Sequence, residues 1–252
     1  MVRTNILSES NIKKVTEQSG IFSIIEYDRD ISVEYDTAMN SYFASKMNLK
    51  TKQVIASLND SGVIVQSGAM QMCMGNINAS TDISSATDLL KKFVGSKVTG
   101  ESAIKPKYVG NGIVVLEPTK KYIILENIGE WNGGMIIEDE LFLACEETVK
   151  MSIVPRNTIS SAVLGGEGLF NTRLEGNGIV ALESKIPREE LVAVELIDDI
   201  LKIDGNMAIA WSNSLKFSVE KTTKTLIGSA ASGEGFVNVY SGTGRVLLAP
   251  IN

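Results

Sequence analysis

The feature that most constrains the fold is a glycine-rich phrase, Gly-x-Gly-x-Val-x-Leu, which occurs three times at one spacing. The copies begin at Gly110, Gly176 and Gly242, so consecutive copies start 66 residues apart. A fixed period of this length is typical of one folding unit duplicated in tandem. We therefore interpret each shared position first as a structural requirement of the repeat and only then as a candidate for chemistry.

The repeat extends beyond the glycine phrase, because a Gly-Glu pair precedes each copy. The predicted turn and repeat positions are Gly100, Glu101, Gly110, Gly112, Gly166, Glu167, Gly176, Gly178, Gly233, Glu234, Gly242 and Gly244. A looser first copy aligns with the second at a shift of 72 residues, which makes Cys73, Cys145 and Trp211 equivalent. A position that accepts a thiol or an indole is predicted to be a buried packing site rather than a redox or metal site.

Short segments rich in Ile, Val, Phe and Tyr alternate in period two between Gly, Asn, Asp and Ser, which predicts an all-β fold. The last copy reads as a hairpin with its turn at Ser241, Gly242, Thr243 and Gly244. One short helix is expected near residues 87–94, in an insertion between copies. We expect a single compact body of three repeats: about 1–95 with the helical insertion, 96–161, and 162–252 with a closing hairpin.

Composition excludes several classes of function. The chain has 252 residues and a net charge of −6, which disfavours nucleic-acid binding. It has no apolar run long enough to cross a bilayer and no secretory pattern at its start, so a cytoplasmic location is expected. Lysines are frequent between residues 91 and 121, where Lys91, Lys92, Lys120 and Lys121 are possible contacts to an anionic surface; a solvated face is the alternative.

Little in the sequence indicates catalysis. Histidine is absent, and the two cysteines have no zinc-ligand spacing. The repeated Glu101, Glu167 and Glu234 are expected to stabilise turns, although three carboxylates near a pseudo-threefold axis are also a candidate cation or acid–base site. No catalytic residue, cofactor or metal site is assigned.

Several motifs, in order, resemble a known family, the mitochondrial biogenesis family named for altered inheritance of mitochondria protein 24, in its bacterial form. They are Ser67-Gly68-Ala69-Met70-Gln71-Met72, Gly100-Glu101-Ser102, Gly165-Gly166-Glu167-Gly168-Leu169-Phe170 and the repeated glycine phrase. The resemblance implies three pseudo-symmetric β-sandwich units of the double-stranded β-helix kind, similar to the subunit of the tryptophan RNA-binding attenuation protein and often self-assembling. Eukaryotic members are linked to mitochondrial inner-membrane organisation, whereas the bacterial family supplies no settled activity and no catalytic residues.

These observations favour a non-enzymatic, homo-oligomeric scaffold or binding protein with possible protein partners. The alternative is a protein that binds a small ligand or an anionic lipid surface, and an enzyme using the repeated glutamates ranks third. RNA binding is disfavoured because aromatic residues make up only 6% of the chain. Fold similarity alone does not transfer function.

Overall fold

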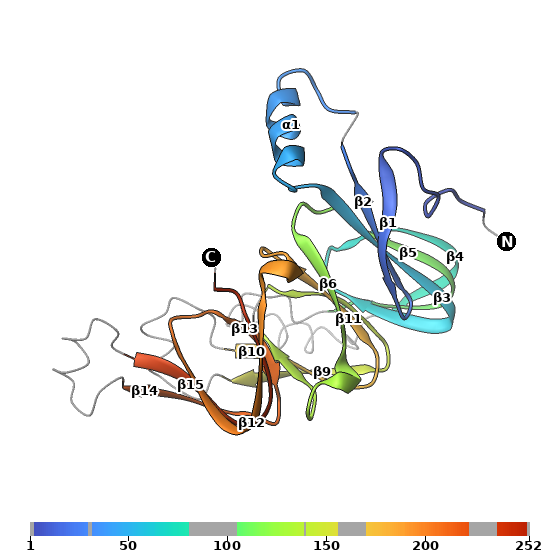
Figure 1. Ribbon diagram of the computed structural model, residues 1–252. Helices are drawn as coiled ribbons and strands as arrows, with labels where there is room; N and C mark the ends of the chain where they lie inside the picture. The colour runs from blue at the N-terminus through green and yellow to red at the C-terminus, as the bar shows by residue number, and fades with distance from the viewer. Residues whose placement is uncertain are drawn as a thin grey trace, which may run out of the picture.

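The fold was analysed in a computed structural model that describes residues 3–29, 32–80, 105–138, 140–155, 170–221 and 236–250. Two antiparallel β-sheets make up the body, and Figure 1 shows them following one another along the molecule. The all-β prediction is confirmed. None of the helices in these described ranges is long and apolar enough to cross a membrane.

The first sheet has eight strands, ordered β1-β2-β3-β8-β11-β6, with β5 paired to β3 and β4 paired to β5. Its strands are β1 (Lys13–Ser19), β2 (Phe22–Tyr27), β3 (Thr51–Val65), β4 (Met70–Ser80), β5 (Lys107–Leu116), β6 (Tyr122–Asn127), β8 (Phe142–Glu146) and β11 (Ile179–Ser184). The order mixes strands from before residue 95 with β5, β6, β8 and β11, so different repeats share one sheet.

The second sheet has seven strands, ordered β12-β15-β13-β7-β10-β9, with β14 paired to β15. Its strands are β7 (Met135–Ile137), β9 (Val149–Pro155), β10 (Phe170–Gly176), β12 (Val192–Asp204), β13 (Ala208–Ser212), β14 (Lys216–Lys221) and β15 (Phe236–Leu248). Short 3-10 turns, η1 (Ile128–Glu130) and η2 (Arg188–Glu190), follow β6 and β11. This sheet joins the second repeat to the third.

The repeat is visible in the apolar core, which has three main clusters in the described residues. The first cluster is built mainly from β2, β3, β5 and β6 and takes in Ala144 of β8 and Ala181 of β11. The second cluster takes in Ala210 and Leu247, which lie 66 residues further along. Each core is therefore completed by the same two positions of the following repeat. The division at residues 95/96 and 161/162 stays a prediction, because both boundaries lie outside the described residues.

The predicted turn at Ser241, Gly242, Thr243 and Gly244 is wrong, because these residues lie inside the continuous strand β15. The glycine phrase instead faces a bulge in the neighbouring strand. Gly244 pairs with Leu196 and Gly242 with Asp199, which leaves residues 197 and 198 unpaired. The backbone N–H of Asp198 donates to Thr243 Oγ1 at 3.0 Å and holds the bulge in place.

The first glycine phrase, in β5, has the same arrangement with β3. Gly112 pairs with Leu58 and Gly110 with Ser61, and the bulged Asp60 donates its N–H to Asn111 Oδ1 at 2.9 Å. Asp60 and Asp198 both have positive φ, of 45° and 51°. The glycines are needed because β4 comes close: a Cβ on Gly110 would lie 2.1 Å from the carbonyl oxygen of Asn76. In the first and third copies the glycines thus shape a bent, closely paired strand rather than a turn. In the second copy Gly176 ends β10 and Gly178 lies in the bend before β11, so the predicted break in the strand is present there.

The helix of the described chain is α1 (Ala38–Lys46), at a place where the sequence predicted none. It lies between β2 and β3, stands away from the sheets in Figure 1 and buries no residue. Its apolar side chains, including Met39, Tyr42 and Phe43, are exposed, so the usual amphipathic pattern is missing. The predicted helix near residues 87–94 lies outside the described residues.

The equivalence of Cys73, Cys145 and Trp211 is only partly confirmed as a buried packing site. Cys145 and Trp211 are 0% and 3% exposed, and Trp211 packs against Phe217 and Tyr240. Cys73 is exposed, so the prediction of burial is wrong there. The reason is position: β8 and β13 lie between strands on both sides, whereas β4 pairs only with β5 in the described part of the chain.

Candidate ligand-binding site

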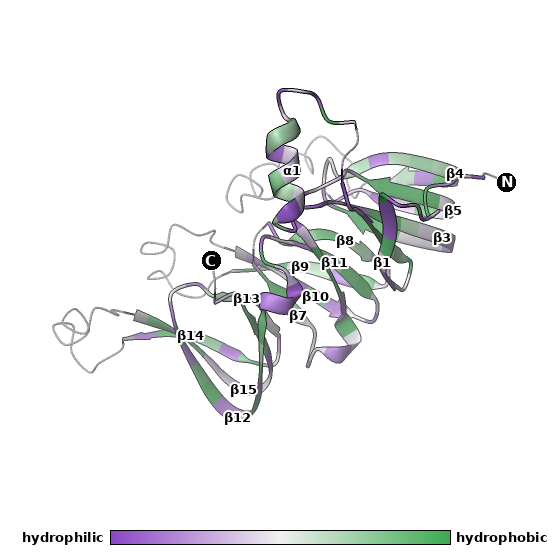
Figure 2. Ribbon diagram, turned by 45° about the horizontal axis from the view of Figure 1, so that its top comes forward, coloured by the Kyte–Doolittle hydropathy of each residue, from purple (hydrophilic) through white to green (hydrophobic). Residues whose placement is uncertain are grey.

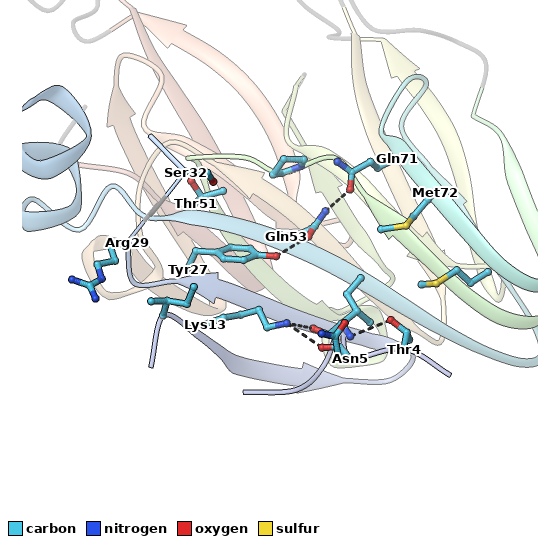
Figure 3. Close-up of a pocket in the computed structure, with 14 residues that line it drawn as sticks. Thr4, Asn5, Lys13, Tyr27, Arg29, Ser32, Thr51, Gln53, Gln71 and Met72 are labelled. Carbon is cyan, nitrogen blue, oxygen red and sulfur yellow. Dashed lines mark hydrogen bonds between the residues drawn. The ribbon is translucent and has the colours of Figure 1, made fainter. Parts of the chain in front are cut away.

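A pocket of about 600 Å³ lies where the segment before β1 folds over the first sheet (Figure 3). Its wall comes from residues before β1, from β1, β2 and β3, and from the start of β4. The lining residues are Thr4, Asn5, Ile6, Ile12, Lys13, Tyr27, Arg29, Ser32, Thr51, Gln53, Gln71, Met72, Met74 and Pro118. Its volume lies within the roughly 300–1,000 Å³ usual for small-molecule sites.

The floor of the pocket is fixed by Gln53, a buried amide in β3. Its Nε2 donates to Gln71 Oε1 at 2.7 Å and to the carbonyl oxygen of Leu116 at 3.0 Å, while its Oε1 accepts from the Tyr27 hydroxyl at 3.3 Å. Gln71 Nε2 in turn donates to Glu117 Oε2 at 3.4 Å. Burial raises the pKa of Tyr27, so its phenol stays a neutral donor at pH 7. This series of hydrogen bonds holds β2, β3 and β4 in one orientation.

The pocket carries two cationic side chains. Lys13 Nζ donates to the carbonyl oxygens of Asn5 at 3.1 Å and Ile6 at 2.9 Å, which leaves one of its three N–H groups. Arg29 is exposed and makes no ion pair within the described ranges. None of the described lining residues is Asp or Glu. The cations therefore favour an anionic group here.

Glu26 in β2 and Asp28, the residue after β2, are both paired with lysines. Lys50 Nζ lies 2.9 Å from Glu26 and 2.8 Å from Asp28, and Lys14 lies 3.7 Å and 3.5 Å from the same two groups. The Lys50 hydrogen bond lowers the pKa of Asp28, and Asp28 raises the pKa of Lys50. This network leaves the charge of Lys13 and Arg29 uncompensated from that side.

The rest of the wall is apolar. Met72 and Met74 of β4 line it together with Ile6 and Ile12, and Met74 packs on a small cluster formed by Ile25, Ile55 and Val115. In Figure 3, Arg29 lies at one end and Met72 toward the other, with Tyr27 and Gln53 between them. Unbranched methionines adapt to ligands of different shape. One end thus suits a charged group and the other an apolar chain.

The predicted repeat glycines do not gather into a site. Five of them, Gly110, Gly112, Gly176, Gly242 and Gly244, lie in strands, while Gly178 lies in the bend between β10 and β11. Gly100, Glu101, Gly166, Glu167, Gly233 and Glu234 lie outside the described residues. The catalytic use of the repeated glutamates therefore stays a prediction. Among the described residues, no three Asp, Glu or Cys side chains come together as a metal site.

The predicted anionic-surface lysines are placed only in part. Lys91 and Lys92 lie outside the described residues, and Lys120 is exposed. Lys121 pairs with Glu183 at 2.8 Å in a second cavity, of about 520 Å³, which Glu117 and Glu140 also line. Carboxylates thus outnumber the lysine in that cavity. The predicted surface contact stays a prediction, and the geometry favours the pocket at Lys13 and Arg29 for an anion.

A third cavity, of about 230 Å³, contains two groups shifted toward their neutral forms. Burial raises the pKa of Glu17, and it lowers the pKa of Lys52, whose ammonium lies 4.5 Å from the centre of the Tyr122 ring. Such a pair is a candidate for proton transfer in principle. The cavity is smaller than usual substrate pockets, so it ranks below the pocket beside β4.

Sequence reasoning missed Lys13, Tyr27, Arg29 and Gln53. The first three lie in the N-terminal part of the first repeat and belong to no recurring phrase. Gln53 is the one uncharged polar residue in the buried run at positions 52–56, which also includes Lys52, and a buried amide is a signal that a fixed polar contact is needed. Gln71 and Met72 belong to the family motif at residues 67–72, which by itself does not predict a pocket.

Three comparisons agree on what the chain is similar to. The family model described as mitochondrial biogenesis AIM24 matches residues 45–251. An uncharacterized protein of Streptococcus pyogenes serotype M6 is 27% identical over 198 residues, which cover 75% of this chain and 77% of that protein. A crystal structure of an S. pyogenes protein matches with a TM-score of 0.57 and 24% identity, covering 81% of this chain and 89% of the crystallised chain, which shows a shared fold.

The family match begins after the N-terminal wall of the pocket, so Lys13, Tyr27 and Arg29 precede it while Gln53, Gln71 and Met72 lie within it. The pocket is thus built partly from the shared fold and partly from a segment in front of it. Because the match spans most of the sequence and all three glycine phrases, the chain belongs to the mitochondrial biogenesis AIM24 family.

Proposed function

We propose that this chain is a non-catalytic binding protein whose N-terminal pocket takes an amphiphilic anion. The observation that carries the proposal is the combination of two cations and an apolar wall in one pocket of about 600 Å³ with no described lining carboxylate. The anionic head, a carboxylate or a phosphate, lies at Arg29 and Lys13, and the apolar chain runs toward Met72 and Met74.

The polar groups of the pocket suit binding better than chemistry. Tyr27 and Gln53 use their hydrogen bonds to fix the wall, and Lys13 uses two of its three N–H groups to hold the segment before β1. The chain has no histidine, and the described lining has no carboxylate to accept a proton. Self-association, the other half of the expectation from sequence, stays a prediction.

Calorimetric titration with decanoate, decyl phosphate and decyltrimethylammonium tests the proposal. We expect both anions to bind and the cation not to bind, and the stronger of the two anions identifies the head group. Arg29→Gln should weaken anion binding about tenfold, because it removes a charge-assisted contact without touching a described partner. Met72→Gln should weaken binding of the decyl chain several-fold.

Lys120→Gln is the matched control, because it removes an exposed lysine that does not line the pocket. It should leave all three titrations unchanged. Equal binding of the cationic and anionic amphiphiles, or an Arg29→Gln variant that binds as well as the wild type, would overturn the assignment. Thermal melting of each variant checks that the fold is intact.

A further inference from the structure

The three repeats are joined inside the chain by one kind of contact, used twice. At the first junction, the end of β3 pairs with β8; at the second, β7 pairs with β13. The pairs of the first junction are Val63↔Glu146, Ile64↔Cys145 and Val65↔Ala144, and those of the second are Met135↔Ser212, Ile136↔Trp211 and Ile137↔Ala210. All of these pairs are antiparallel.

The registers of the two junctions are the same. Moving from the first junction to the second adds 72 to each residue number on β3 and 66 to each number on β8, which are the two repeat shifts seen in the sequence. Both junctions are also buried: Val65 and Ala144 are 0% exposed, as are Ile137 and Ala210. Neighbouring repeats therefore join through a fixed and closely packed strand pair.

The same shifts define a third pair of strand segments that is not joined in the chain. Residues 201–203 of β12 follow β7 by 66, and residues 72–74 of β4 precede residues 144–146 of β8 by 72. Within the described ranges β12 pairs only with β15, and β4 pairs only with β5. Each strand therefore keeps one edge without a described partner.

The exposure of the two strands fits an unfilled junction. Met72 is 41% exposed and Cys73 is exposed, although the equivalent Ala144 and Cys145 are fully buried. On β12, Ile200 is 58% exposed, whereas Ile203 is already buried in the third cluster, as the equivalent Ile137 is in the second. Long strand edges with exposed apolar side chains are sites of pairing with another chain unless they are protected.

Figures 1 and 2 show β4 and β12 at opposite ends of the molecule, so the two edges do not meet within one chain. We propose that β12 of one chain pairs with β4 of a second copy of this chain, head to tail and antiparallel. The internal register predicts the pairs Leu201↔Met74, Lys202↔Cys73 and Ile203↔Met72. Continued along both strands, it places Ile200 opposite Gly75.

The chemistry of the two edges suits this pairing. β4 has no charged residue, so nothing on it repels Lys202 or Asp204 of the second copy. Leu201 and Ile203 would lie on the same face as Met74 and Met72, because directly opposite residues of a strand pair share a face. The two surfaces differ, so the contact is heterologous and repeats from copy to copy into a closed ring or a filament.

The contact between copies is smaller than the internal junctions. Val115 is equivalent to Ala181 and Leu247, which complete the cores of the preceding repeats, but Ile6 and Leu7 already pack beside it. The strand edge, and not this face, is what a second copy uses. Since Met72 and Met74 line the ligand pocket, the added strand would run along its rim.

Cysteine cross-linking tests the register in the full-length chain. Lys202→Cys places a thiol opposite the native Cys73, and mild oxidation should give disulfide-linked dimers and higher multimers on a non-reducing gel. The ladder should disappear in the Lys202→Cys/Cys73→Ser variant. Glu195→Cys, on the same strand but seven residues away, is the matched control and should cross-link at least tenfold less.

A charge-swap series measures the same contact without a covalent bond. Cys73→Arg faces Lys202 of the second copy and should weaken association about fivefold in sedimentation, relative to Cys73→Ser. Adding Lys202→Glu should restore it. Cys73 does not line the ligand pocket, so the change leaves that site in place.

Four outcomes would overturn the proposal. One is a wild-type chain that stays monomeric and gives no cross-link; a second is a 73–202 disulfide formed only within one chain. A third is efficient dimerisation of the wild type through Cys73 alone, which would indicate β4 paired with β4. The fourth is association that ignores both Cys73→Arg and its rescue.

Discussion

Strands β4 and β8 hold the same position in successive repeats and lie in opposite surroundings. Cys145 on β8 is 0% exposed between two paired strands, while Cys73 on β4 is exposed at the end of the sheet. Cys73 lies between two methionines and Cys145 between Ala144 and Glu146, so the adjacent residues do not explain why only Cys145 is buried; the neighbouring strands do. A repeat position becomes core only where another repeat covers it.

The largest expected effect comes from placing a charge at both positions. Cys145→Asp should destabilise the fold by about 3–5 kcal/mol, because it buries an unpaired carboxylate. Cys73→Asp should change stability by less than about 0.5 kcal/mol, since water solvates the new charge. Urea unfolding followed by the fluorescence of the buried Trp131 and Trp211 measures both variants. Similar losses in the two variants would remove the distinction between β4 and β8.

Two glycine substitutions sharpen the comparison between the first and last glycine phrases. Gly110→Ala should cost about 2–3 kcal/mol, because its φ is +143° and its new Cβ would meet the backbone of β4 at 2.1 Å. Gly242→Ala has a φ of +119° but no atom closer than 3.8 Å, so the cost should be near 1 kcal/mol. The same urea titration ranks the two. Equal costs would show that close approach of β4 does not explain the first glycine phrase.

The smallest expected effect is a difference in thiol chemistry that leaves the fold intact. In the native protein, Ellman's reagent at pH 8 should modify Cys73 readily and Cys145 only after unfolding. Burial raises the pKa of Cys145 to about 12, and partial burial raises that of Cys73 less. Two fast-reacting thiols in the native chain would contradict the burial of β8.

The same pKa shift predicts a pH dependence. Above the ordinary thiol value of 9.0 the unfolded chain loses the Cys145 proton while the folded chain keeps it, so stability should fall between about pH 9 and pH 12. The fall should be smaller in Cys145→Ala, which has no thiol to titrate. A pH profile of the urea midpoint for the two proteins isolates this contribution from that of other groups.

The predictable parts of the fold are those with a period. Alternating apolar residues predicted the strands, and the 66-residue spacing predicted equivalent strands such as β8 and β13. The turn at Gly242 was predicted wrongly, because glycine with positive φ serves a bulged strand as well as a hairpin turn. The helix α1 was missed, because its apolar residues follow no buried face.

The pocket was beyond sequence reasoning for a related reason. Lys13, Tyr27 and Gln53 come from three strands, and nothing in their spacing along the chain shows that they line one cavity. Gln71 reaches the side chain of Gln53 only because β4 pairs with β5, which in turn pairs with β3. A pocket whose lining residues come from strands far apart in the sequence leaves no recognisable motif in any one segment.

The sequence by itself determined the all-β class, the repeat and the positions that recur in it, because strand periodicity and glycine conformation are properties of neighbouring residues. The tertiary structure alone decided which recurring positions are buried, which strand edges are left at the ends, and where Lys13, Arg29 and Met72 meet. Burial and convergence depend on which strands pair across long stretches of chain, and that choice is made by the packing of the whole molecule.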